Sequence, residues 1–132
     1  MIKGSCLCGN VQYTYSGEIT EIARCHCSQC RKAQGGAFAT NSPLDANKLT
    51  IKGTEFIKEF EATGDKVRAF CTNCGSPIYS AKASLPEIKR IRLGTVETEF
   101  RCENQYHIYS DSVACWDEIT DNFQQFEQNK LT

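Results

Sequence analysis

Seven of the nine cysteines in this chain fall into three clusters whose spacing suits metal binding. The clusters are Cys6-Leu7-Cys8, Cys25-His26-Cys27-Ser28-Gln29-Cys30 and Cys71-Thr72-Asn73-Cys74. Cysteines two or three residues apart are badly placed to bridge each other, but they converge well on one ion at about 2.3 Å per zinc–sulfur bond. Groups of four and three thiolates predict two zinc sites, one closed and one open. The open site is where chemistry can take place.

The closed site is predicted on Cys6, Cys8, Cys71 and Cys74. Residues i and i+2 of an extended segment face the same way, so Cys6 and Cys8 can share one ion. Cys71 and Cys74 form a zinc knuckle, and Gly75 permits the backbone bend beside it. The alternative is a pair of redox-active dithiols. Paired CxC and CxxC motifs favour structural zinc over that alternative.

The open site is predicted on Cys25, Cys27 and Cys30. Cys25 and Cys27 share a face of an extended segment, and Cys27 and Cys30 share a face at the start of a helix. The fourth position then stays free for water, a substrate thiolate or an outside ligand. The alternative is a second structural zinc that another residue closes. His26 is expected to point away from the ion as a supporting or packing group rather than a ligand.

Short extended segments must position these clusters, and the sequence predicts a mostly β fold of several twisted antiparallel strands with one short helix. Ser28 can cap that helix, which spans residues 28–33, and Gly35-Gly36 ends it. A short helical turn or a loose tail is expected at 121–128. The predicted strands are 11–15, 22–24, 37–40, 49–52, 56–60, 67–70, 77–80, 88–93 and 106–109.

Length and charge narrow the class of protein. At 132 residues the chain is expected to form a single domain, 1–132. The formal net charge is −1 and no run of five basic residues occurs, so no nucleic-acid partner is expected. No apolar stretch suits a membrane span, and no signal peptide is evident at the start. An odd cysteine count without an export signal predicts the cytoplasm. Cys102 and Cys115 receive no role.

The three cysteine motifs, in this order, resemble the glutathione-dependent formaldehyde-activating enzyme family, which also includes centromere protein V. The resemblance rests on residues 4–9, 25–32 and 70–77, and residues 35–41 and 116–121 fit the same pattern. It implies a β-tent fold, a structural zinc on Cys6, Cys8, Cys71 and Cys74, and a more labile zinc on Cys25, Cys27 and Cys30. It also implies the addition of glutathione to formaldehyde, which gives S-hydroxymethylglutathione.

Three functions are compatible with these motifs. One is a zinc-dependent carbon–sulfur lyase acting on an adduct of glutathione with formaldehyde or a similar small aldehyde. The others are a non-catalytic carrier of glutathione or another small thiol, and a two-zinc interaction module. Three thiolates around Zn²⁺ carry a formal charge of −1, and glutathione is itself anionic. Cations must offset this repulsion, and Arg24, Arg31 and Lys32 are the candidates nearest in sequence, unless they are solvated surface charges.

Overall fold

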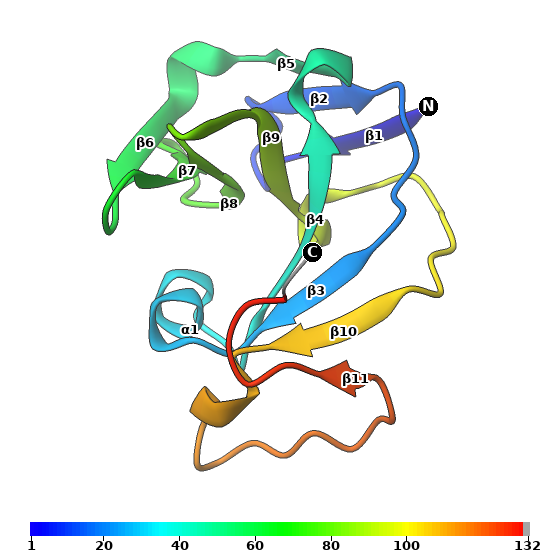
Figure 1. The fold of residues 1–132 in the computed structure, drawn as a ribbon. Helices are drawn as coiled ribbons and strands as arrows, with labels where there is room; N and C mark the ends of the chain where they lie inside the picture. Colours follow the sequence, from blue (N-terminus) through cyan, green and yellow to red (C-terminus); the bar gives the residue numbers. More distant parts are fainter. Residues whose placement is uncertain (131–132) are drawn as a thin grey trace.

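The computed structural model describes residues 1–130 of the chain and consists mainly of strands (Figure 1). Three strands form a small sheet in the order β1-β2-β5, and eight form a larger one in the order β11-β10-β3-β4-β9-β8-β7-β6. The strands are β1 (Ile2–Ser5), β2 (Gln12–Tyr15), β3 (Ile22–Cys25), β4 (Ala39–Asp45), β5 (Leu49–Lys52), β6 (Ile57–Glu61), β7 (Lys66–Cys71), β8 (Pro77–Lys82), β9 (Leu85–Arg92), β10 (Gln105–Ile108) and β11 (Gln124–Gln125).

One α-helix, α1 (Ser28–Gln34), follows the middle cysteine cluster, so the predicted mostly β class with a short helix at that place is confirmed. Short 3₁₀ turns at 46–48, 54–56, 93–95 and 110–112 connect strands. None of the helices in the described part of the chain has the length and apolar character that a membrane crossing needs.

The helix begins differently from the prediction. Its N-cap is Cys27 rather than Ser28, because the Cys27 sulfur accepts a hydrogen bond from the Cys30 N–H at 3.3 Å. Its end agrees with the prediction. Gly35 adopts a left-handed conformation with φ of 74°, and its N–H donates to the Arg31 carbonyl. Cys27, one of the three clustered cysteines, therefore caps the helix that carries Cys30.

Strand pairing also departs from the expected antiparallel pattern at one edge. Strand β10 pairs in parallel with β3 and with the two-residue strand β11, which lies where a helical turn or a loose tail was expected. The long segment between β9 and β10 allows β10 to run beside β3 in the same direction, which a parallel pair requires. Strand β1 was not predicted either, although β1 and β2 form a regular antiparallel pair.

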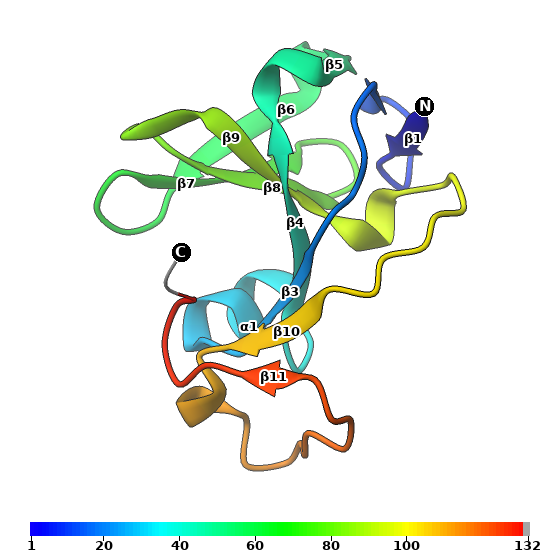
Figure 2. The same ribbon diagram turned by 45° about the vertical axis from the view of Figure 1, so that its right-hand side comes forward.

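Two groups of buried side chains make up the core. The first is drawn from both sheets and includes Val11, Tyr13, Leu44, Ile78 and Ile91. The second lies under α1, where β3 and β10 run side by side (Figure 2), and contains the middle cluster's own sulfurs: its members are Ala23, Cys25, Cys30, Ala39, Tyr106 and Ile108. Folding of this second core therefore brings the middle cysteines together.

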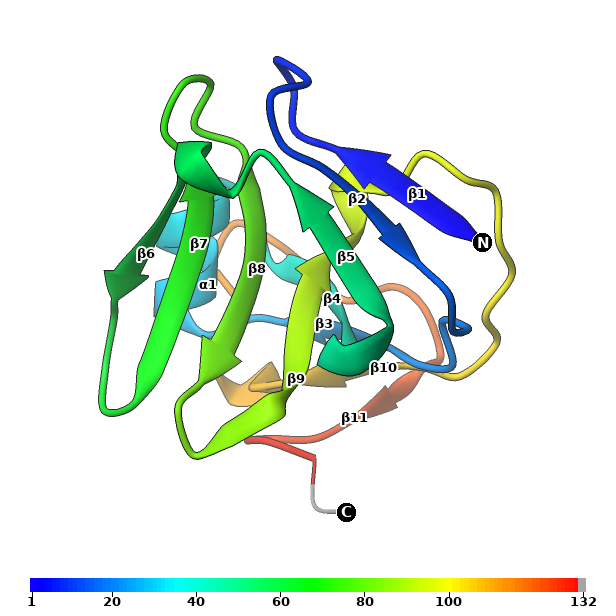
Figure 3. The same cartoon turned by 90° about the horizontal axis from the view of Figure 1, so that it is seen from above.

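The two outer cysteine clusters lie on hairpin turns. One turn joins β1 to β2 and the other joins β7 to β8, and both lie at the same end of the molecule when it is viewed from above (Figure 3). Gly53, which directly follows β5, packs against the first turn at Asn10. It has φ of 82°, and a Cβ at this position would collide with the backbone carbonyl of Asn10.

Replacing Gly53 by alanine should therefore destabilise the protein. We expect a loss of about 2–4 kcal/mol, from the positive φ and from the clash with a backbone group that cannot move aside. Gly64→Ala is the matched control, because Gly64 also has a positive φ but has open space where a Cβ would stand. Denaturant unfolding of both variants measures the difference. Equal losses would show that contact with Asn10 is unimportant.

Candidate functional site

Cys6, Cys8, Cys71 and Cys74 converge, with their four sulfur atoms all within 4.8 Å of one another. The Cys6–Cys8 and Cys8–Cys71 sulfur distances are 3.6 Å and 3.8 Å. A tetrahedral ion with zinc–sulfur bonds of about 2.3 Å sets its sulfurs about 3.8 Å apart. All nine cysteines are free thiols rather than disulfides. The number, type and spacing of these sulfurs therefore fit a four-coordinate zinc ion.

Matching glycine turns shape both halves of this cluster. Gly9 and Gly75 each follow a cysteine and adopt φ of 82° and 79°. The Gly9 N–H donates to the Cys6 carbonyl at 3.1 Å, and the Gly75 N–H donates to the Cys71 carbonyl at 2.8 Å. A residue with a side chain is strained in this left-handed conformation. The glycine after each second cysteine thus lets both turns fold back toward a shared centre.

Ser76 connects the two turns. Its hydroxyl oxygen accepts a hydrogen bond from the Leu7 N–H at 2.9 Å and lies 3.3 Å from the Cys74 sulfur. The hydrogen bond from Ser76 lowers the pKa of Cys74 to about 5. That sulfur is therefore available as a thiolate near neutral pH, which is the form that binds a metal.

Cys25, Cys27 and Cys30 form the second cluster, with their sulfurs also within 4.8 Å of one another. Cys25 ends β3, Cys27 caps α1 and Cys30 lies in the first turn of the helix. Within residues 1–130, no fourth cysteine, histidine, aspartate or glutamate joins the group. The three sulfurs therefore fit an ion that keeps one position free.

Arg68 compensates the charge of this cluster from β7. Its Nη2 donates to the Cys30 sulfur at 3.5 Å. Hydrogen bonds from Cys25 and Cys27, together with Arg68, lower the pKa of Cys30, and the same sulfur–sulfur contacts raise the pKa of Cys25. The guanidinium of Arg68 therefore favours a thiolate at Cys30.

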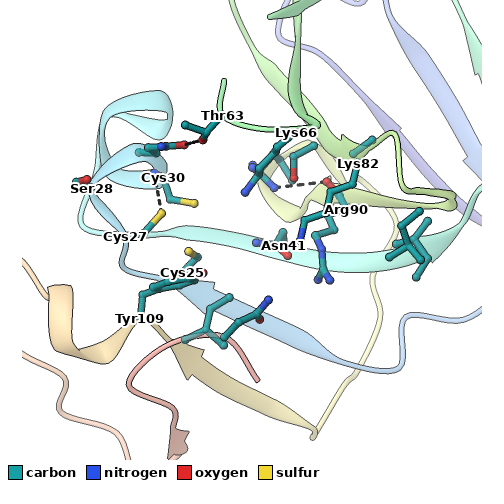
Figure 4. Close-up of a pocket in the computed structure, with 18 residues that line it drawn as sticks. Cys25, Cys27, Ser28, Cys30, Asn41, Thr63, Lys66, Lys82, Arg90 and Tyr109 are labelled. Atoms are coloured by element: carbon teal, nitrogen blue, oxygen red, sulfur yellow. Dashed lines mark hydrogen bonds between the residues drawn. The ribbon is translucent and has the colours of Figure 1, made fainter. Parts of the chain in front are cut away.

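A cavity of about 300 Å³ opens beside the three cysteines (Figure 4). Its lining is basic and polar with an apolar patch, and it contains Cys25, Cys27, Ser28, Gln29, Cys30, Asn41, Thr63, Lys66, Ser80, Ala81, Lys82, Leu85, Ile88, Arg90, Arg92, Ile108, Tyr109 and Asn129. Lys66, Lys82 and Arg90 reach into it from the side opposite the sulfurs. A ligand in this space would have the thiolates at one end and cations at the other.

The strand register explains why cations gather here. Cross-strand partners face the same side of a sheet, and so do residues i and i+2. The paired residues are Lys66 with Lys82, Arg68 with Ser80, Ser80 with Arg90, and Asn41 with Arg92. The alternate face carries Ala69, Tyr79 and Ile91, which are buried in the first core. Burying the apolar face leaves the basic face toward the cavity.

The three cations predicted to assist a substrate lie elsewhere. The Arg31 Nε donates to the His26 carbonyl at 3.2 Å, Lys32 lines a separate groove over β6 and β7, and the Arg24 guanidinium lies 5.0 Å from the centre of the Phe123 ring. None of them lines the cavity beside the cysteines. Proximity in sequence to Cys30 does not bring Arg31 and Lys32 inward, because the helix turns their side chains away.

Tyr109 is a site residue that the sequence did not single out. It lines the cavity and lies beside Cys25 in Figure 4. Its φ of 54° is the one positive value among non-glycine residues of the described chain. Bulky residues rarely adopt this conformation, and such strain is concentrated at functional sites. Burial and the nearby thiolates raise the pKa of Tyr109, so its hydroxyl keeps its proton.

His26 takes part in a buried chain of hydrogen bonds instead of joining the sulfurs. Its side chain is fully buried, and its Nε2 lies 2.8 Å from His107 Nδ1. His107 Nε2 in turn lies 2.9 Å from an Asp121 oxygen. Since the carboxylate only accepts, His107 Nε2–H donates to Asp121 and His26 Nε2–H donates to His107. The chain anchors the residue between Cys25 and Cys27 to the C-terminal segment.

The sequence contains a signal for the basic side of the cavity. Basic residues recur two apart, as Lys66 with Arg68 at the start of the predicted strand 67–70 and Arg90 with Arg92 on the predicted strand 88–93. Such a pair on a strand whose alternate residues are apolar indicates a basic face. Only the pairing of these strands with one another, and with the strand that ends at Cys25, places that face beside the cysteines.

Removing the carboxylate of Asp121 should destabilise the protein. Asp121→Ala leaves the buried His107 Nε2–H without an acceptor, which costs about 1–3 kcal/mol. Asp121→Asn should recover part of the loss, because its amide oxygen can accept the same hydrogen bond. The exposed Asp111→Ala is the control. Thermal unfolding compares the three variants, and an Asp121→Ala variant as stable as the control would contradict the proposed donor direction and its importance.

Comparisons with known proteins identify relatives of the chain. The sequence model of the family described as "Glutathione-dependent formaldehyde-activating enzyme" matches residues 1–112. A Halomonas elongata protein, provisionally named as such an enzyme, is 30% identical over 127 residues, covering 90% of this chain and 81% of its own length. An uncharacterized lyase of Schizosaccharomyces pombe is 28% identical over 79 residues, covering 60% of this chain and 56% of its own.

A solved structure supports the fold. The crystal structure of a Rhodobacter sphaeroides protein superposes with a TM-score of 0.61 at 24% identity, and the match covers 74% of this chain and 90% of that one. This likeness bears on the fold alone. The sequence match, which includes all three cysteine motifs, shows that the chain belongs to the glutathione-dependent formaldehyde-activating enzyme family.

Proposed function

We propose that the protein is a zinc-dependent carbon–sulfur lyase of the S-(hydroxymethyl)glutathione synthase type. The observation that carries this proposal is the three-cysteine cluster at one end of a cavity, without a fourth protein ligand among residues 1–130. A closed structural site would need no such opening. The family's name supplies the thiol and the aldehyde, which are glutathione and formaldehyde.

The two cysteine clusters have different roles in this proposal. Cys6, Cys8, Cys71 and Cys74 hold a structural zinc, and Cys25, Cys27 and Cys30 hold a second zinc with an open position. The second ion, when bound, supplies the positive charge that keeps a substrate thiol deprotonated near neutral pH. Free cysteine thiols imply a reducing compartment, so we place the protein in the cytoplasm. We also propose that residues 1–132 form one domain.

The chain's own residues complete the site. Lys66 and Arg90 face the sulfurs across the cavity and hold the carboxylates of the thiol, while Arg68 offsets charge at Cys30. We assign the side chains of Ser28 and Tyr109 to the aldehyde oxygen as hydrogen-bond donors. The sulfur forms a bond to the aldehyde carbon, the carbonyl π bond breaks, and the thiol proton ends on the new hydroxyl oxygen. The reverse reaction breaks the carbon–sulfur bond.

Metal content tests the assignment of the clusters. Purified protein should hold between one and two zinc ions, because four thiolates from two rigid turns bind more tightly than three. Cys27→Ser should stay folded with about one zinc ion fewer, whereas Cys71→Ser should unfold or precipitate, because zinc binding at that cluster is part of the folding free energy. The exposed Cys115→Ser is the control and should keep all its zinc.

Elemental analysis and thermal unfolding give the readouts. Equal damage from Cys27→Ser and Cys71→Ser would contradict the division into structural and open sites. Absence of zinc together with disulfides in the mass spectrum would contradict both sites.

Thiol binding tests the open position. Calorimetric titration should show that glutathione binds and that S-methylglutathione binds far more weakly, because methylation removes the ionisable sulfur and keeps both carboxylates. Cys27→Ser should lose this discrimination. Equal affinity for the two ligands would rule out capture of the thiolate at the metal.

The same samples separate an enzyme from a carrier. Nuclear magnetic resonance exchange measurements with formaldehyde should show faster formation and breakdown of S-hydroxymethylglutathione with the protein than without it. Binding without any acceleration would favour the non-catalytic thiol carrier. Failure to bind either thiol would favour the interaction module.

A further inference from the structure

The charges around the cavity are one-sided. Four cations line it, Lys66, Lys82, Arg90 and Arg92, and no aspartate or glutamate does so within the described residues. The remaining oxygen-bearing side chains of the lining are neutral, and they come from Ser28, Gln29, Asn41, Thr63, Ser80, Tyr109 and Asn129. The space beside the sulfurs is therefore built to attract negative charge.

Within the described residues, no carboxylate neutralises these cations. In residues 1–130, the pairs within salt-bridge distance are His107 with Asp121 and Lys130 with Glu21, so none of the four has a carboxylate partner. Arg92 is only 4% exposed, and burial lowers its pKa and that of the half-buried Lys66. A buried charge without a partner is costly, so an anion in the cavity would relieve this cost.

The cysteine cluster offsets only part of this charge. Three thiolates with Zn²⁺ carry a formal charge of −1, and Arg68 already donates to Cys30. The four lining cations still exceed that charge. Guanidinium groups such as those of Arg90 and Arg92 suit planar oxyanions, which they bind with two parallel hydrogen bonds.

We propose that this cavity recognises its thiol through oxyanion groups alone, and that its preferred substrates are thiols with two or more carboxylate, sulfonate or phosphate groups and no ammonium. The inference rests on the proposed thiol capture at Cys25, Cys27 and Cys30. Glutathione carries two carboxylates but also an ammonium group, for which the described lining, apart from the three metal-binding sulfurs, offers only neutral acceptors among four cations. The ammonium group therefore weakens binding rather than contributing to it.

A matched pair of ligands tests this inference. The probes are glutathione and N-glutaryl-cysteinylglycine, which lacks the amino group but keeps the thiol and both carboxylates. Calorimetry with the zinc-loaded full chain should show the deaminated ligand binding about tenfold more tightly, since one repulsive charge is removed. The preference should shrink at high salt, because screening weakens both attraction and repulsion. Glutathione binding as tightly as, or more tightly than, the deaminated ligand would overturn the inference and leave thiol capture intact.

A failure of the proposed thiol capture would give a different result in the same titration. If neither thiol binds, the proposed capture at the three cysteines is itself overturned, and this inference falls with it.

Substitution of a lining cation gives a second readout. Arg90→Gln should weaken binding of both ligands and reduce the preference for the deaminated one, because the cation that repels the ammonium is gone. Arg101→Gln, which removes the same charge from an exposed position outside the cavity, is the control and should change neither affinity. A merely structural role of Arg90 would lower both affinities equally. An unchanged preference in Arg90→Gln would therefore overturn the inference.

Discussion

The register of β4, β9, β8 and β7 is the constraint on which the candidate site depends. Because side chains alternate along each strand, this register buries Ala69, Tyr79 and Ile91 on one face and presents the basic residues on the other. A slip of one residue in β9 would bury Arg90 and Arg92 against the apolar core. The same hydrophobic burial that stabilises the fold therefore also fixes the charge of the cavity.

The two cysteine clusters are connected through this sheet. Cys71 ends β7, the strand from which Lys66 faces the cavity and Arg68 donates to the Cys30 sulfur, and the β7–β8 turn completes the four-cysteine cluster. A zinc ion at that cluster would hold the hairpin in register at its far end. The structural site would then influence substrate binding without touching the substrate, by keeping the strands that carry the cations in place.

Sequence patterns were sufficient for the local features and insufficient for the long-range ones. The helix at 28–34, its end at Gly35 and the convergence of the three middle cysteines follow from spacing and turn chemistry that operate over a few residues. Three other features depend on residues far apart in the sequence. They are the basic lining of the cavity, the parallel pairing of β10 with β3, and the hydrogen-bonded chain of His26, His107 and Asp121. No local pattern specifies which strands pair. For that reason the sequence points to Arg31, a neighbour of Cys30 in sequence, and gives no indication that Arg90 belongs to the site.

X-ray absorption at the zinc edge tests the central claim most directly, because it counts the sulfur atoms around the ions. Two filled sites have seven protein sulfurs between them, and a captured thiolate brings the total to eight. The account predicts that glutathione raises the average sulfur count, with the new bond at about 2.3 Å, and that S-methylglutathione does not. An unchanged count with bound glutathione would contradict thiolate capture at the three-cysteine cluster.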